Sequence, residues 1–420
     1  MTDRETFILK LDYKRSYFVR IIKRYFASYS GLPKQCWQGI GLGFVEATLV
    51  GVCFFLSLYF VNVLHFNIAM AGIIISFYGL GRVIGGLVGG KLSDTMPPEL
   101  VSIGSLLVQA AAFFLLIKLK TFYFLIINLF ILGVAAYGFI ISNNVWVLNQ
   151  CKHQELAKLK SLSMLHASSN LGIGLSALIV SVLSGYQFSS IFLLSGVLLF
   201  LSAIYLIYVE RKKIYSESYV EEGVEQVSIQ QTSVLGQNKK IVFMVLICLF
   251  FIGLIIAQLG TTYSIYLNNA FPSLGVSGVS ILFALNSILI VVFQTPLVDF
   301  FGSYNKVLMI GVGAFLMGFG MFMLNFSFVF MMAIIACIIY TIGEMLFFSI
   351  AQLVCYQSSD EKKRGQSLGL FRMIFALSIF VGPATGGFIY HHLGANFVWD
   401  VCGIIGVACL MACHYYRKYG

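Results

Sequence analysis

Six ionisable side chains interrupt the long apolar stretches of this sequence, and their chemistry most needs an explanation. They are Glu46, Arg82, His166, Glu344, Arg372 and Asp400. An ionisable group in an apolar membrane segment costs at least about 3 kcal/mol unless it is paired or faces water, so each is a functional candidate. A carboxyl group in an apolar cavity also keeps a proton more readily than one in water. Glu46 and Glu344 are therefore candidates for binding and releasing protons, whereas Asp400 is expected to be structural.

The composition defines the setting of these charges. Of 420 residues, 59% are hydrophobic and 10% are charged. A membrane helix needs about 20 apolar residues to cross about 30 Å of hydrocarbon, and such runs recur along the whole chain. We therefore predict an all-α polytopic membrane protein.

Two further classes of site are not indicated. The net charge of +10 arises from basic residues in short connections between apolar runs, so it predicts membrane topology rather than a nucleic-acid partner. The nine cysteines are scattered without a CxxC pair, which indicates neither a metal site nor a disulfide framework. We expect them to fill the core, and we expect no cofactor.

The apolar runs predict twelve transmembrane helices. They are expected at about 37–64, 68–90, 100–117, 122–148, 161–185, 190–209, 241–267, 276–298, 306–324, 328–355, 366–390 and 396–415. On one side of the membrane the connections carry no lysine or arginine except Lys118 and Lys120, so both termini are expected to be cytoplasmic. The expected location is the cell (inner) membrane, as a monomer.

One long polar connection divides the spans six and six. The expected organisation is a basic leader at 1–36, which suits a helix on an anionic membrane surface or a topology anchor, and bundles at 37–209 and 241–416. A linker at 210–240 joins the bundles, and a tail occupies 417–420. Internal duplication follows from this arrangement.

The duplication is visible in the sequence itself. At an offset of 206, His166 aligns with Arg372, and at an offset of 205, Asp94 aligns with Asp299 and Gly138 with Gly343. Each equivalence falls at the same helix and the same depth.

These features together resemble the major facilitator superfamily, and within it the twelve-span drug-efflux-like (drug:proton antiporter-like) transporters. The resemblance covers 37–415. Its motifs are GLGRVIGGLVGGKLSD at 79–94, SMLHASSNLG at 163–172, GEMLFF at 343–348, FRM at 371–373 and GPATGG at 382–387. It implies two pseudo-symmetric six-helix bundles that rock about a central site.

The sequence also departs from the drug/proton antiporter pattern. The family's loop motif continues after its aspartate with basic residues, whereas Asp94 is followed by Thr95, Met96 and two prolines. The fourth span, 122–148, lacks the arginine usual in antiporters. The Gly382-Pro383 pair lies in the eleventh span rather than the fifth.

The resemblance implies that spans 1, 4, 7 and 10 line a central cavity, where Glu46 and Glu344 would couple proton movement to transport. Two structural alternatives stay open, a pair between Glu46 and Arg82 and a hydrogen bond of Glu344 within its own bundle. The residues that we expect to line the cavity or contact solute, unless they serve only packing, are Arg82, Tyr137, Asn143, Asn144, Gln258, Tyr263, Tyr340 and Phe347.

The same architecture places the loop after span 2 beside span 11, and the loop after span 8 beside span 5. We therefore predict two gate contacts, Asp94 with Arg372 and Asp299 with His166 or with the positive helix N-terminus near it, which form when the cytoplasmic side closes. The alternative is that each charge is satisfied locally.

The function predicted from these features is proton-coupled efflux of a small organic solute. One alternative is an importer or facilitator of a metabolite or iron chelate with the same fold, and another is a non-transporting membrane sensor or scaffold. An enzyme is not expected, because the sequence contains no nucleophile–base cluster or phosphate loop.

Overall fold

A computed structural model describes residues 32–150, 155–183, 188–217, 239–301, 304–357 and 364–417, and these residues form helices without a strand. Twelve helical segments in this part of the chain are long and apolar enough to cross a membrane, which confirms the predicted number. Most of the predicted leader, linker and tail lies outside the described residues.

The first bundle contains six spans. Its elements are α2 (Lys34–Val50), η1 (Gly51–Phe55), α3 (Leu56–Leu58) and η2 (Tyr59–Val63), which together form span 1, then α4 (Ile68–Thr95), α5 (Pro98–Lys118), α6 (Phe122–Gln150), α7 (Glu155–Leu183) and α8 (Phe188–Glu217).

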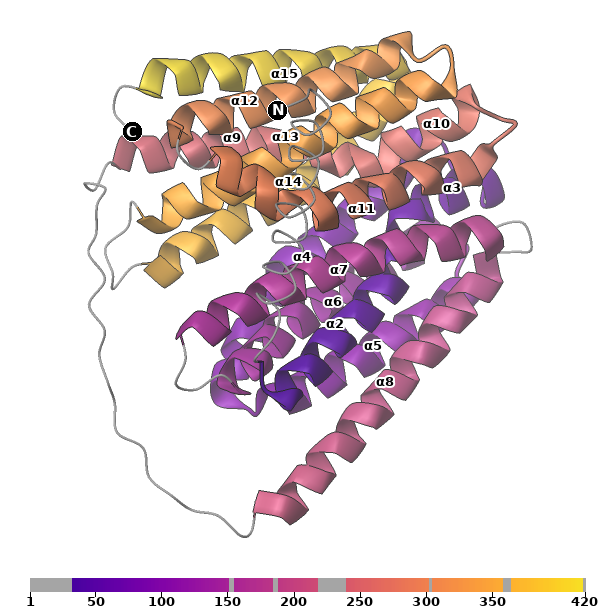
Figure 1. Ribbon diagram of the computed structural model, residues 1–420. Coiled ribbons are helices and arrows are strands. Elements are labelled where there is room, and N and C mark those ends of the chain that lie inside the picture. The colour runs from indigo at the N-terminus through magenta and orange to yellow at the C-terminus, as the bar shows by residue number, and fades with distance from the viewer. Residues whose placement is uncertain are drawn as a thin grey trace, which may run out of the picture.

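The second bundle repeats this plan. Its elements are α9 (Lys239–Gln258), η3 (Leu259–Tyr263) and α10 (Ser264–Ala270), which form span 7, then α11 (Gly275–Phe301), α12 (Lys306–Phe322) with η4 (Met323–Phe326), α13 (Phe330–Gln357), α14 (Arg364–Leu393) and α15 (Ala395–Tyr416). In Figure 1 the indigo-to-pink helices of the first bundle lie mostly below the salmon-to-yellow helices of the second.

We call the side of the molecule where α2 and α9 begin and α8 ends the linker side, and the opposite side the distal side. Helix α4 runs from the distal side to the linker side, and α14 runs in the opposite direction. The second span is longer than predicted, because α4 continues to Thr95 and includes Lys91 and Asp94 in its last turns. Met96, which precedes Pro97, is extended (φ −131°, ψ 156°), as expected for a residue before proline, and ends the helix.

Small residues set the packing inside the first bundle. Gly81, Gly85 and Gly89 recur at every fourth position of α4 and face α6. A methyl group at Gly85 would collide with the backbone carbonyl of Val134, and one at Gly89 would lie 2.8 Å from the Cα of Gly138. In lipid, where helices gain no hydrophobic energy by associating, such close backbone approach supplies the packing energy.

Spans 1 and 7 are both irregular in their distal halves. Both contain a π-helical turn, η2 in span 1 and η3 in span 7. In η3 the Thr261 hydroxyl donates to the Ala257 carbonyl (3.1 Å), and the Ser264 hydroxyl donates to the Leu259 carbonyl (2.9 Å). These hydroxyls satisfy backbone groups that a widened turn exposes within the membrane. Such turns are frequent at functional sites.

The close contact of α4 and α6 predicts a specific loss of stability. Gly85→Ala should lower the apparent unfolding temperature in detergent, because overpacking against a fixed backbone costs about 1–3 kcal/mol. Gly90→Ala on the same helix is the control, since a methyl group there meets nothing within 4 Å. Equal unfolding temperatures for the two variants would contradict this account of the packing.

Candidate functional site

Glu46 lies inside the first bundle and is only 4% exposed. Its Oε1 has no hydrogen-bond partner among the described residues, and the groups that act on the carboxyl are Arg82 of α4 and Gln109 of α5. The guanidinium of Arg82 is half-buried and lies over the rings of Tyr137 (5.1 Å) and Tyr78 (5.9 Å). A buried carboxyl therefore has a cation and two aromatic faces as neighbours on adjacent helices.

Glu344 has a different environment in the second bundle. It is half-buried on α13, and its Oε2 accepts a hydrogen bond of 2.9 Å from the Asn286 amide of α11. The same amide donates to Thr341 Oγ1 at 3.0 Å. The predicted alternative, a hydrogen bond of Glu344 within its own bundle, is therefore present, and its partner Asn286 is neutral. Asp400 accepts a bond of 2.7 Å from Asn325, which gives it a local structural partner.

The predicted gate residues lie at the linker side. Asp94 and Arg372 are both exposed, and neither forms an ion pair with the other in the described part of the chain. His166 is exposed, its Nδ1 lies 3.0 Å from the Asn170 amide nitrogen, and Arg372 acts on it electrostatically. The side chain of Asp299 lies outside the described residues. Both predicted gate contacts stay predictions.

The expected cavity residues divide into two groups. Five are buried at 4% exposure or less: Asn143, Gln258, Tyr263, Tyr340 and Phe347. Arg82, Tyr137 and Asn144 are half-buried. Two of the buried side chains hold helices together, because Asn143 donates to the Gly39 carbonyl (3.0 Å) and Gln258 donates to the Gly382 carbonyl (3.0 Å). In this conformation the first group packs against neighbouring helices, and any contact with solute stays a prediction.

Contacts between the bundles join the motifs at 79–94 and 382–387 to residues that the sequence did not single out, namely Gly72, Ser76 and Ile379. The backbone N–H of Ala384 on α14 donates to Ser76 Oγ on α4 at 2.9 Å. A methyl group at Gly79 would lie 2.5 Å from the Ile379 carbonyl oxygen, and one at Gly72 would collide with the Pro383 carbonyl. We call this contact of α4 with α14 the distal seam. The signal that could have found it is the Gly-xxx-Ser spacing at 72 and 76 opposite a helical proline.

Proline explains why the seam has this form. Pro383 has no N–H, so the carbonyl of Ile379, four residues earlier, lacks its usual helical partner. That carbonyl points at Gly79, where the absence of a side chain lets α4 approach. The segment of α14 before Pro383 therefore packs directly against α4 of the opposite bundle.

The distal half contains two further contacts between the bundles. Ser181 Oγ of α7 donates to Ser277 Oγ of α11 at 3.0 Å. The Ser264 hydroxyl donates to the Phe54 carbonyl at 3.4 Å, and the rings of Phe54 and Phe283 are 5.4 Å apart. In Figure 1 the bundles meet at the right, around α3 and α10, and the left-hand ends of α7 and α14 spread apart. The distal side is thus closed.

Comparison with known proteins identifies the family. The family model of the Major Facilitator Superfamily matches residues 39–383. The chain belongs to the Major Facilitator Superfamily. The uncharacterized MFS-type transporter YttB of Bacillus subtilis (strain 168) is 26% identical over 355 residues, which cover 80% of this chain and 83% of that protein.

Solved structures share the fold. The nucleoside transporter NupG superimposes with a TM-score of 0.71 at 16% identity, covering 92% of this chain and 99% of the other. A POT family transporter in complex with 5-aminolevulinic acid gives a TM-score of 0.73 at 13% identity, covering 93% and 99%. The resemblance inferred from the motifs is thus confirmed for the superfamily, and membership supports secondary transport of a small solute across a membrane.

The distal seam predicts how the conformational equilibrium responds to one methyl group. Gly79→Ala should separate α4 from α14 and raise the population with an open distal side about tenfold. The added methyl group destabilises the closed state by about 1–3 kcal/mol through overpacking, and the open state does not contain this contact. Spin labels at Asn67 and Leu393 would report the distance between the distal ends of the two helices. Gly90→Ala, also on α4, should leave that distance distribution unchanged, and an identical distribution in Gly79→Ala would refute the role of the seam.

Proposed function

We propose that this protein exports a small organic solute in exchange for protons, with Glu46 and Glu344 as the proton-binding groups. The observation that carries the proposal is the buried carboxyl of Glu46, whose Oε1 has no hydrogen-bond partner within the described part of the chain and which lies under the influence of Arg82. A neutral carboxyl group is tolerated in such a place, whereas a charged one draws the guanidinium towards it.

Helix α4 connects this site to the distal seam. Arg82, which responds to the charge on Glu46, lies three residues after Gly79, which contacts α14. A proton that binds Glu46 weakens the attraction on Arg82 and so changes the preferred position of α4 against α14. In the proposed cycle, binding and release of this proton favour different conformations of the two bundles. The solute site between the bundles then opens first to one side of the membrane and then to the other.

The proposed orientation places the linker side in the cytoplasm. Its support is the clustering of lysine and arginine at that side, among them Lys91, Lys240, Lys306 and Arg417. With the distal side closed, the conformation described here then faces inward. Closure of the inner side would bring Asp94 towards Arg372.

Import of a metabolite or iron chelate is the second candidate. The observation in its favour is the departure from the antiporter pattern, namely the absence of an arginine from 122–148 and of a basic arm after Asp94. Accumulated and secreted metabolites of a deletion strain, compared with those of its parent, distinguish the two directions. Export predicts a solute retained in the mutant cells, whereas a solute left in the medium supports import.

Proton coupling is tested by removing one acid at a time. In proteoliposomes loaded with the solute identified in that comparison, Glu344→Gln should abolish uphill transport driven by a pH gradient but preserve exchange of solute for solute. An amide cannot release a proton, yet it keeps the contact with Asn286. Asp400→Asn is the matched control and should transport uphill normally, because Asp400 already has a local partner in Asn325. Uphill transport by Glu344→Gln at the rate of the unmodified protein would refute the role of Glu344 in proton coupling.

The gate is tested by cross-linking. Asp94→Cys combined with Arg372→Cys should form a disulfide only in conditions that close the inner side, such as saturating solute or a changed pH. The native cysteines of the described residues are buried, so they compete little. Asp94→Cys alone controls for cross-links between copies. Failure of the double variant to cross-link in every condition would remove this contact from the mechanism.

A further inference from the structure

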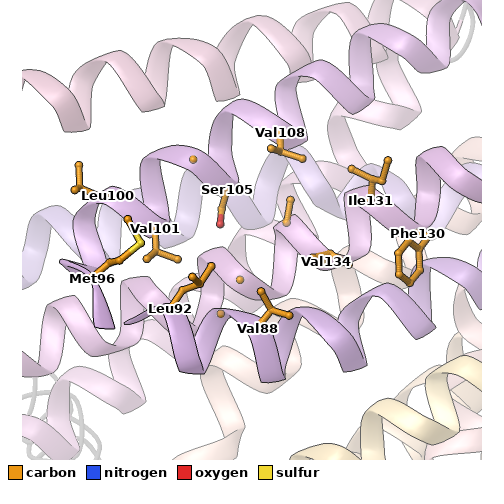
Figure 2. Close-up of a pocket in the computed structure, with 14 residues that line it drawn as sticks. Val88, Leu92, Met96, Leu100, Val101, Ser105, Val108, Phe130, Ile131 and Val134 are labelled. Atoms are coloured by element: carbon orange, nitrogen blue, oxygen red, sulfur yellow. The ribbon is translucent and has the colours of Figure 1, made fainter. Parts of the chain in front are cut away.

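An apolar groove lies on the outer face of the first bundle. It has a volume of about 430 Å³ and is bounded by α4, α5 and α6. Figure 2 shows it running from Met96 and Leu100 at the linker end to Phe130 and Ile131 near mid-span. Along α4 it extends from Val88 to Met96, about 12 Å at the helical rise.

The floor of the groove is made of small residues. They include Gly89, Gly104 and Gly138, and a methyl group at Gly104 would meet nothing within 4 Å. The second bundle differs at the equivalent place. A methyl group at Gly343, the counterpart of Gly138 in the repeat, would lie 2.6 Å from the α12 backbone, whereas the nearest atom to one at Gly138 is the Ser105 hydroxyl oxygen at 3.1 Å. The space beside Gly138 therefore has no counterpart beside Gly343.

The chemistry of the lining restricts the occupant. Ser105 contributes the only polar side chain among the residues that line the groove. An ordered water needs two to four polar partners, so the groove suits hydrocarbon rather than water or a polar solute. Val88 and Leu92 are 42% and 39% exposed although they belong to a membrane span, and Met96, directly after that span, is 47% exposed, so the groove opens to the lipid.

The shape and charge of the groove favour one class of lipid. An α-helix of a second copy is about 10–12 Å wide with its side chains, too wide to enter between neighbouring helices, whereas an acyl chain is slender. Lys91 is exposed on α4 between the lining residues Gly89 and Leu92, more than one helical turn before Met96, and forms no ion pair among the described residues. A lysine in this position attracts a lipid phosphate.

We propose that this groove is a binding site for one acyl chain of an anionic phospholipid whose phosphate lies at Lys91. The chain runs along α4 over Gly104 and Gly138 and ends near Phe130. The lipid belongs to the leaflet on the linker side. The site does not depend on the transported solute or its direction.

Photolabelling of the full chain tests this site. The protein is reconstituted in vesicles of phosphatidylethanolamine and phosphatidylglycerol that contain a phosphatidylglycerol probe with a diazirine near the end of one acyl chain. After irradiation, mass spectrometry of peptides should locate the label around Phe130 and Val108. Label spread evenly over the exposed faces of α12 and α15 would overturn the proposal, as would contacts between two copies at Met96 and Leu100.

Two variants make the test quantitative. Gly104→Leu should lower labelling about tenfold, because each excluded methylene changes affinity about fourfold. Gly90→Leu, on α4 but outside the groove, should label normally. Lys91→Gln should lower labelling by the anionic probe about fivefold, the effect of one lysine near a charged membrane surface. If Gly104→Leu does not fold, Val108→Phe fills the groove from its exposed side. Unchanged labelling in a folded groove-filling variant refutes the site.

Discussion

The close approach of α4 and α14 in the distal half is the constraint on which the arrangement of the two bundles depends. In a bilayer, helices associate through backbone contact and hydrogen bonds rather than by escaping water. Gly72, Ser76 and Gly79 provide both, opposite the segment of α14 that Pro383 disturbs. Because these contacts require the two backbones to touch, a small separation loses all of them together. Such a seam favours two discrete positions over a continuum.

In the proposed mechanism, the charge on Glu46 controls the distal seam through helix α4. Glu46 and Arg82 lie on α2 and α4, and α4 also carries the glycine face of the seam. Reversing a two-state equilibrium from 1:99 to 99:1 takes about 5.5 kcal/mol. In the proposed mechanism, protonation of Glu46 removes the attraction that its charge exerts on Arg82 and supplies part of that difference.

The two halves share an arrangement of helices but differ in the residues that surround their buried carboxyl groups. Glu46 has a cation beside it, whereas Glu344 has the neutral amide of Asn286. Gly138 leaves a groove against α5, whereas Gly343 packs against the α12 backbone. A duplicated fold therefore supplies the symmetry needed for alternating access. Local differences in sequence give the two halves different surroundings for their buried carboxyl groups and different helix packing.

The sequence by itself determined the twelve spans, the division into equivalent halves, the superfamily and the short set of ionisable residues. The superfamily follows from the resemblance of its motifs, and the others follow from hydropathy, spacing or charge, which are properties of the chain. Only the tertiary structure decided which polar residues pack between helices, as Gln258 and Asn143 do, and which opposing atoms meet, as Ser76 and Ala384 do. The physical reason is that lipid and protein core are equally apolar. A membrane helix therefore shows no hydrophobic periodicity to tell one face from another, and its contacts are fixed by shape and by a few buried polar groups.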